Sequence, residues 1–260
     1  MLRRMRSKAL CTIAAGLLVT RTALSADPFE IQVYDGTANG PGVPGIELHS
    51  NAVVSGLKEA PAPELPMNHQ LHFTLEPSYG VTSFWEIGGY FQTAVADGSF
   101  DYAGVKLRSK LVTPPGWHPH LRLGLNIELS LLPTTFDPNE WGMELRPIIA
   151  WENDDVLLAL NLTTSAPLAG PDFHLGPTFG PAAMAVYKIQ RRVSVGFEYY
   201  SDLGPITAPA PVAEQEHYLY EVMNLLAVPH FELNLGFGEG LTSGSNRFVA
   251  KLILGYSWER

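Results

Sequence analysis

The chain has 260 residues, of which 46% are hydrophobic, and its 17 Lys and Arg against 26 Asp and Glu give a net charge of −9 at pH 7. This length allows one large all-β domain or two ordinary domains. The acidic balance excludes nucleic acid as an expected partner, because binding to a phosphate backbone requires an excess of Lys and Arg.

A signal peptide is predicted over residues 1–26. Four basic residues between positions 3 and 8 precede an apolar run from Ala9 to Val19, and small residues lead to a cleavage site near Ser25 or Ala26. The apolar run is shorter than the roughly 20 residues that a membrane-spanning helix needs. Cleavage removes the only cysteine and leaves 12 Lys and Arg against 26 Asp and Glu, a net charge of −14, in an exported chain without disulfide bonds.

After a Gly- and Pro-rich segment of residues 27–45, the chain alternates between apolar and polar residues. The stretch from His120 to Leu131 is the clearest case, since six Leu or Ile residues alternate with polar residues or glycine. A strand places such residues on opposite faces, whereas a helix would scatter them around its circumference. The same pattern predicts twelve strands, at 46–56, 69–79, 84–95, 101–112, 119–131, 142–151, 156–165, 179–189, 193–201, 215–226, 230–238 and 247–257.

The links between the predicted strands alternate between short and long. GVTS and ENDD are short, whereas PLAGPDFHLGPT and DLGPITAPAPVAE are long and rich in Pro or Gly. Strands of about ten residues, an even strand count and this asymmetry of the links are typical of transmembrane β-barrels. We therefore predict that residues 46–260 form an all-β, antiparallel up-and-down barrel of about 12 strands in the bacterial outer membrane, with its apolar face against lipid.

Aromatic residues near the predicted strand ends favour this barrel over the alternative, a secreted soluble β-sandwich. A membrane barrel carries aromatic girdles where its wall meets the lipid head groups. The strands of a soluble sandwich are usually shorter, with about five or six residues. The residues expected in the girdles are Tyr79, Trp85, Trp151, Tyr199, Tyr256 and Trp258.

The turn from Gly80 to Glu86, with the pattern Gly-Val-Thr-x-x-Trp-Glu, adds to the signal peptide and the closing aromatic strand. In these features the chain resembles bacterial outer-membrane β-barrel families of poorly characterised function. One of them is the outer-membrane family linked to the phenol meta-cleavage pathway. The resemblance implies a channel or transporter-like role and insertion with the help of periplasmic chaperones and the barrel-insertion machinery. Such barrels typically end on an aromatic residue, whereas Glu259 and Arg260 follow Trp258 here.

The polar face of the alternating strands is predicted to line the barrel lumen. Cross-strand parity places Glu86 opposite Arg108 or Lys110 on the next strand, where opposite charges stabilise a sheet by about 0.2 to 1 kcal/mol per pair. The predicted lumen-lining residues are Glu76, Glu86, Lys106, Arg108, Lys110, Arg122, Asn126, Glu128, Glu144, Arg146, Glu198 and Glu232.

Such a charged wall has two interpretations that the sequence leaves open. Facing acidic and basic ridges select a polar or charged solute in a channel. They also hold a narrow barrel closed as a sealed, structural envelope barrel, and about twelve strands lie between the filled and the open kinds. Residues 27–45 are expected either in the lumen, as a partial plug, or as a periplasmic tail. Both ends of the mature chain are expected in the periplasm.

Enzymatic alternatives have less support from the sequence. Glu76 and Glu86 share a face, as a glycosidase pair requires, but other lumen acids share it too. An outer-membrane lipid hydrolase needs an outward serine beside an outward histidine, and none is apparent from the pattern. The motif from His118 to His120 is interpreted as a turn. We therefore predict no enzymatic activity, no metal site and no cofactor.

Overall fold

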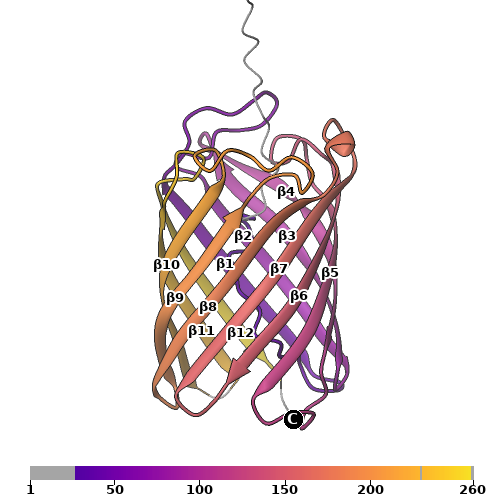
Figure 1. Ribbon diagram of the computed structural model, residues 1–260, viewed down its shortest axis with the longest axis vertical. Coiled ribbons are helices and arrows are strands. Elements are labelled where there is room, and N and C mark those ends of the chain that lie inside the picture. Colours follow the sequence, from indigo (N-terminus) through magenta and orange to yellow (C-terminus); the bar gives the residue numbers. More distant parts are fainter. Residues whose placement is uncertain (1–26, 229, 259–260) are drawn as a thin grey trace, which may run out of the picture.

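The computed structural model describes residues 27–228 and 230–258, which form one closed antiparallel β-barrel (Figure 1). The predicted signal peptide and the terminal Glu259 and Arg260 lie outside the described residues. Each strand pairs with its neighbours in chain order, and β1 pairs with β12 to close the sheet. No helix among the described residues is long and apolar enough to cross a bilayer.

All twelve predicted strands are present, each within a few residues of its expected limits, and the predicted barrel is confirmed. A single-turn 3-10 helix, η1 (Phe173–Leu175), lies in one of the long loops. The strands are β1 (Pro44–Ser55), β2 (Leu71–Thr82), β3 (Trp85–Ala96), β4 (Ser99–Val112), β5 (Leu121–Leu131), β6 (Trp141–Glu152), β7 (Val156–Ala169), β8 (Thr178–Gln190), β9 (Val193–Asp202), β10 (Glu216–Val228), β11 (Phe231–Gly240) and β12 (Phe248–Ser257).

Across the described residues, the strand pairing leaves no exposed sheet edge. β1 and β12 pair in register from Gly45 opposite Ser257 to Val53 opposite Val249. Closure satisfies the backbone groups that an open edge would leave unpaired in lipid. This closure explains why strands this long and apolar form a discrete barrel.

Long loops gather at one end of the barrel and short turns at the other (Figure 1). The end of β12 lies with the short turns, at the bottom of the figure. The β3–β4 connection is the short exception at the long-loop end, because a two-residue turn with Asp97 and Gly98 at positive φ closes that hairpin.

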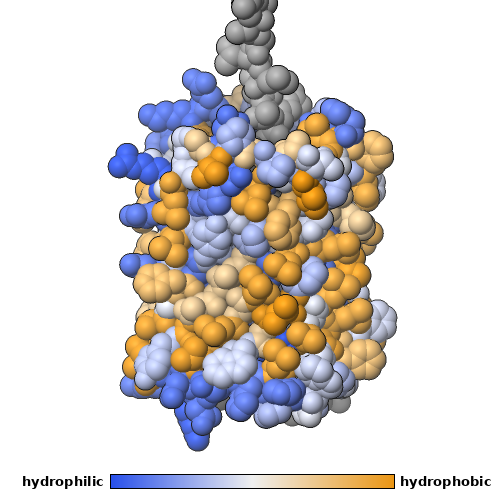
Figure 2. All heavy atoms as spheres, in the orientation of Figure 1, coloured by the Kyte–Doolittle hydropathy of each residue, from blue (hydrophilic) through white to orange (hydrophobic). Residues whose placement is uncertain are grey.

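The outer wall is apolar, and Figure 2 shows hydrophobic residues spread over the face in view. Leu75, Leu107, Phe197 and Phe237 are among the large apolar side chains that are exposed on the strands. An apolar surface of this extent is expected to contact lipid, because a soluble monomer rarely exposes contiguous apolar patches larger than a few hundred Å². Of the six aromatic residues expected in the girdles, five are exposed, namely Tyr79, Trp85, Trp151, Tyr256 and Trp258.

Residues 27–43, called the strap below, run through the interior of the barrel and precede β1. Near the long loops, the ring of Phe29 contacts the ring of Phe136 at 5.7 Å between centroids. At the short-turn end, Gly42 donates a backbone hydrogen bond to Gly80. Asp27 therefore lies inside the barrel, and residues 27–43 occupy the lumen rather than form a tail outside it. The strap enters β1 at the short-turn end only after it has crossed the lumen.

A glycine in the inner wall makes room for a large ring. Gly238 on β11 lies opposite Tyr220 on β10, and a Cβ at this position would lie 2.4 Å from atoms of the tyrosine ring. We expect Gly238→Ala to lower the free energy of unfolding by about 1–3 kcal/mol through overpacking. Urea unfolding in detergent micelles measures the change. Gly40→Ala is the control, because its added Cβ would meet its nearest atom at 3.6 Å, and equal stability losses in both variants would contradict the packing argument.

Candidate functional site

The interior of the barrel is the candidate site, because buried charged residues converge there. Two predicted lumen residues lie towards the short-turn end, where the Arg122 side chain is partly buried and Glu232 is exposed. The other ten are buried: Glu76, Glu86, Lys106, Arg108, Lys110, Asn126, Glu128, Glu144, Arg146 and Glu198.

The guanidinium of Arg108 joins the two glutamates that the sequence places ten residues apart. Its nitrogens lie 2.8 Å from a carboxylate oxygen of Glu76 and 2.6 Å from one of Glu86. Lys110 lies directly opposite Glu86 in the register, with its ammonium 2.9 Å from that carboxylate. The predicted pairing of Glu86 is thus confirmed. Glu86 lies opposite Gly80 on β2, so Glu76 and Glu86 are not direct cross-strand partners, and both carboxylates are held by cations.

Three acidic residues of the strap each meet a basic residue of the wall. The Asp27 carboxylate lies 2.5 Å from the Lys106 ammonium, and the Asp35 carboxylate lies 3.3 Å from the Arg122 guanidinium. Glu30 meets Arg146, which also binds Glu144 on its own strand. The strap sequence contains no basic residue. The strap therefore supplies negative charge to the basic residues Lys106 on β4, Arg122 on β5 and Arg146 on β6, which are called the basic ridge below.

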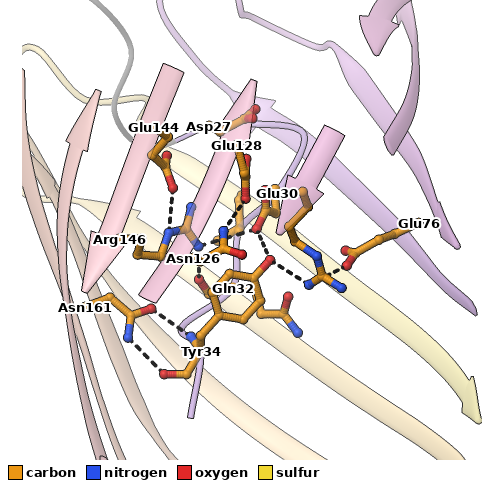
Figure 3. A network of polar contacts seen from close by, with 12 residues as sticks. Asp27, Glu30, Gln32, Tyr34, Glu76, Asn126, Glu128, Glu144, Arg146 and Asn161 are labelled. Carbon is orange, nitrogen blue, oxygen red and sulfur yellow. Dashed lines mark hydrogen bonds and ion pairs between the residues drawn. The ribbon is translucent and has the colours of Figure 1, made fainter. Parts of the chain in front are cut away.

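Polar side chains of the wall also hold the strap backbone (Figure 3). The Asn161 amide makes two hydrogen bonds of 2.8 Å, in which its oxygen accepts from the Tyr34 N–H and its nitrogen donates to the Tyr34 carbonyl. The Thr74 hydroxyl donates to the Phe29 carbonyl at 2.9 Å, and the Lys251 ammonium donates to the Ile31 carbonyl at 3.0 Å. These bonds satisfy backbone groups that are shielded from bulk water.

The Tyr34 side chain lies at the centre of the charged cluster. The Arg146 guanidinium is 4.8 Å from the centroid of its ring, a distance at which cation–π attraction is favourable. The Tyr34 hydroxyl lies 2.7 Å from the Glu30 carboxylate and 2.7 Å from the Tyr90 hydroxyl. The Tyr34 side chain thus links the strap to Tyr90 on β3 and to Arg146 on β6.

The opposite half of the lumen combines the buried ion pair of Lys251 and Glu198 with a large apolar and aromatic cluster, and the sequence did not predict that cluster. Ile31 and Val33 of the strap lie in one buried cluster with wall residues Met184, Tyr200, Tyr218, Tyr220 and Val222. The alternation along β10 could have indicated this cluster, because Tyr218, Tyr220 and Val222 lie on the same face of the strand as Glu216. The lumen is therefore two-sided, and the alternating strap matches it with a polar and an apolar face.

Little free volume remains beside the strap. A cavity of about 30 Å³ lies between the strap and the tyrosine wall, and one of about 90 Å³ lies towards the long loops beside Phe136 and Asp137. A water molecule needs roughly 10–15 Å³ by such a measure, so these spaces hold a few waters. Burial raises the pKa of the Asp137 carboxyl to about 6. With the strap in this position, the lumen is filled.

The outer wall contains a serine–histidine pair that the sequence analysis missed. Ser201 and His217 are direct cross-strand partners on β9 and β10, so the prediction that no outward serine has an outward histidine nearby is wrong. The Ser201 hydroxyl donates to the Pro181 carbonyl at 2.8 Å, and the ring nitrogens of His217 lie within hydrogen-bond distance of Tyr199 and Gln215. The serine is buried. This arrangement does not present an activated nucleophile to a lipid.

Comparisons with known proteins identify the fold. No protein-family model matches the chain, and no curated protein matches it by sequence. An outer membrane channel from Pseudomonas putida F1 superposes with a TM-score of 0.61 at 14% identity, over 88% of this chain and 100% of that one. The chain has the fold of outer-membrane channels. KdgM porin has a TM-score of 0.55 at 10% identity, over 83% of this chain and 99% of that one. NanC porin has a TM-score of 0.53 at 9% identity, over 84% of this chain and 100% of that one.

Removing Arg108 tests the charged cluster. We expect Arg108→Leu to lower the free energy of unfolding by about 3–5 kcal/mol, because it leaves two buried carboxylates without their shared cation. Urea titration of the folded barrel in micelles measures the loss. Arg191→Leu, in the exposed β8–β9 turn, is the control and should leave the stability within about 0.5 kcal/mol. A loss as small as the control's would contradict the role of Arg108.

Proposed function

We propose that the protein is an outer-membrane channel for small polar or charged solutes, closed at rest by the strap in its lumen. The observation that carries this proposal is the set of ion pairs between the strap acids and the basic ridge. Non-covalent pairs hold the strap in the lumen, and its release would leave a charged path of the kind that selects solutes in channels. The likeness to outer-membrane channels in fold supports it.

The strap has the local features of a movable segment. Gly36 and Gly42 both have φ of +76°, a backbone conformation that glycine adopts without strain. They flank the stretch between the last ion pair of the strap, at Asp35, and the start of β1. Rotation at these positions moves the strap while the barrel wall stays intact.

A sealed structural barrel is the second candidate, and the filled lumen favours it. The cavities of about 30 and 90 Å³ are too small for a solute while the strap is in place. The two candidates differ in whether the strap leaves the lumen, which conductance measures directly. A lipid hydrolase has less support, because the Ser201 hydroxyl and the His217 ring are each bound to other groups.

Location and partners follow from the same proposal. The apolar outer wall favours contact with outer-membrane lipid, and insertion requires export, periplasmic chaperones and the barrel-insertion machinery. Membership of the family linked to the phenol meta-cleavage pathway stays a prediction from the resemblance. Fractionation of cells, with the protein in the outer-membrane fraction and heat-modifiable mobility on gels, tests the location.

Neutralising the strap tests the gate. We expect the triple variant Asp27→Asn, Glu30→Gln and Asp35→Asn to raise the frequency of channel openings in planar bilayers at least tenfold over wild type, because it removes the charges that hold the strap on the basic ridge. A control variant carries the same kind of change at exposed loop acids, Glu59→Gln, Asp97→Asn and Asp154→Asn. No channel events in wild type or in the strap variant would contradict the channel and favour the sealed barrel.

Arg122→Glu in the strap variant tests whether the solute path passes the short-turn end of the lumen. Arg122 is partly exposed, so this change avoids the buried cluster. We expect the reversal potential in a salt gradient to shift towards cation selectivity, because a negative charge replaces a positive one beside the path. An unchanged reversal potential would remove Arg122 from that path.

A further inference from the structure

Three ligand-type side chains meet on the inner wall at the junction of β1 and β2. Glu47 and His49 are two residues apart on β1 and therefore share its inner face. Glu76 on β2 lies directly opposite Glu47 in the register. The spacing along β1 places Glu47 and His49 together, and pairing of β1 with β2 across a long loop adds Glu76.

The atoms of this group converge on the Nε2 atom of His49. Nε2 lies 3.4 Å from Oε2 of Glu47 and 3.2 Å from Oε2 of Glu76, and the three ligand atoms all lie within 4.8 Å of one another. A metal about 2.1 Å from each ligand separates them by about 3.4 Å in a tetrahedron and about 3.0 Å in an octahedron. The observed distances from the imidazole to both carboxylates have that size.

We propose that Glu47, His49 and Glu76 bind a divalent transition-metal ion of the zinc class. One imidazole nitrogen with two carboxylate oxygens is a donor set that zinc accepts. Calcium and magnesium prefer oxygen ligands alone, and the imidazole selects against them. The site lies in the lumen and does not depend on whether the barrel conducts.

Neighbouring residues orient the two carboxylates. The second oxygen of Glu76 lies 2.8 Å from the Arg108 guanidinium, which leaves Oε2 directed at the histidine. Gln32 of the strap donates a hydrogen bond of 3.3 Å to Oε2 of Glu47. Partners of this kind fix ligand orientation in metal sites, and their loss typically costs about 10–100-fold in affinity.

The site also has an open side. Glu76 and His49 are buried, whereas the Glu47 side chain is 32% exposed. Gly255 on β12 lies opposite Glu47, and a Cβ there would lie 3.4 Å from Cγ of Glu47 and 3.5 Å from Cβ of Glu232. Because the Glu47 side chain is the exposed member of the group, an ion would reach the site from the side of Glu47, where a water would complete the coordination.

The test is a titration of the full mature protein, without an affinity tag, folded in detergent and treated with EDTA before dialysis. Co²⁺ is the probe, because its visible d–d absorption reports both binding and coordination geometry. We expect saturation at one equivalent and displacement of the Co²⁺ spectrum by one equivalent of Zn²⁺. A titration without saturation at one equivalent overturns the proposal, and the group is then a static pair between an imidazolium and its carboxylates.

Variants locate the site. We expect His49→Asn and Glu47→Gln each to weaken Co²⁺ binding at least tenfold. His72→Asn is the matched control, since His72 is another buried lumen histidine, on β2, whose Nε2 contacts the Gln70 amide and no carboxylate. Heat-modifiable gel mobility checks that each barrel is folded, and Glu47→Gln, at the partly exposed position, serves if His49→Asn does not fold. Saturation at one equivalent that survives both substitutions overturns the assignment.

Discussion

The buried charges of the lumen are stable only because opposite charges lie against them. Removing a carboxylate or an ammonium from water costs several kcal/mol, and only close pairing with further hydrogen bonds offsets that cost. Arg108, shared by Glu76 and Glu86, shows the principle on the wall, and Lys106, shared by Asp27 and Glu128, extends it to the strap. The position of the strap follows from this constraint, because its acids complete the pairing of the basic ridge.

The barrel was predictable because the features that specify it lie within single strands and short turns. Strict alternation from Leu121 to Leu131 fixes which residues face lipid, and the closed sheet follows from twelve such strands. Cross-strand parity extends the prediction to pairs within one hairpin. It placed Glu86 opposite Arg108 or Lys110, and Lys110 is the direct partner in the register. Rules of this kind reach across a short turn, because the turn fixes the register.

The arrangement inside the lumen was much less predictable. Asn161 on β7 binds the backbone of Tyr34, which is 127 residues away, and no local pattern indicates that contact. The register between strands also decides that the ring of Tyr220 lies over Gly238. In the same way, it brings Glu76 beside Glu47 and His49. Alternation shows that a residue faces inwards, but which partner it meets depends on closure and on the strap.

The place of the strap has a consequence for assembly. Its contacts extend from β1, where Glu47 accepts a hydrogen bond from Gln32, to β12, where Lys251 donates to the Ile31 carbonyl, so they involve both the first and the last strand. The surface that binds the strap is therefore complete only once β12 has paired with β1. During assembly the strap lies against an incomplete wall, and pairing of the last strand both closes the barrel and completes the contacts that hold the strap.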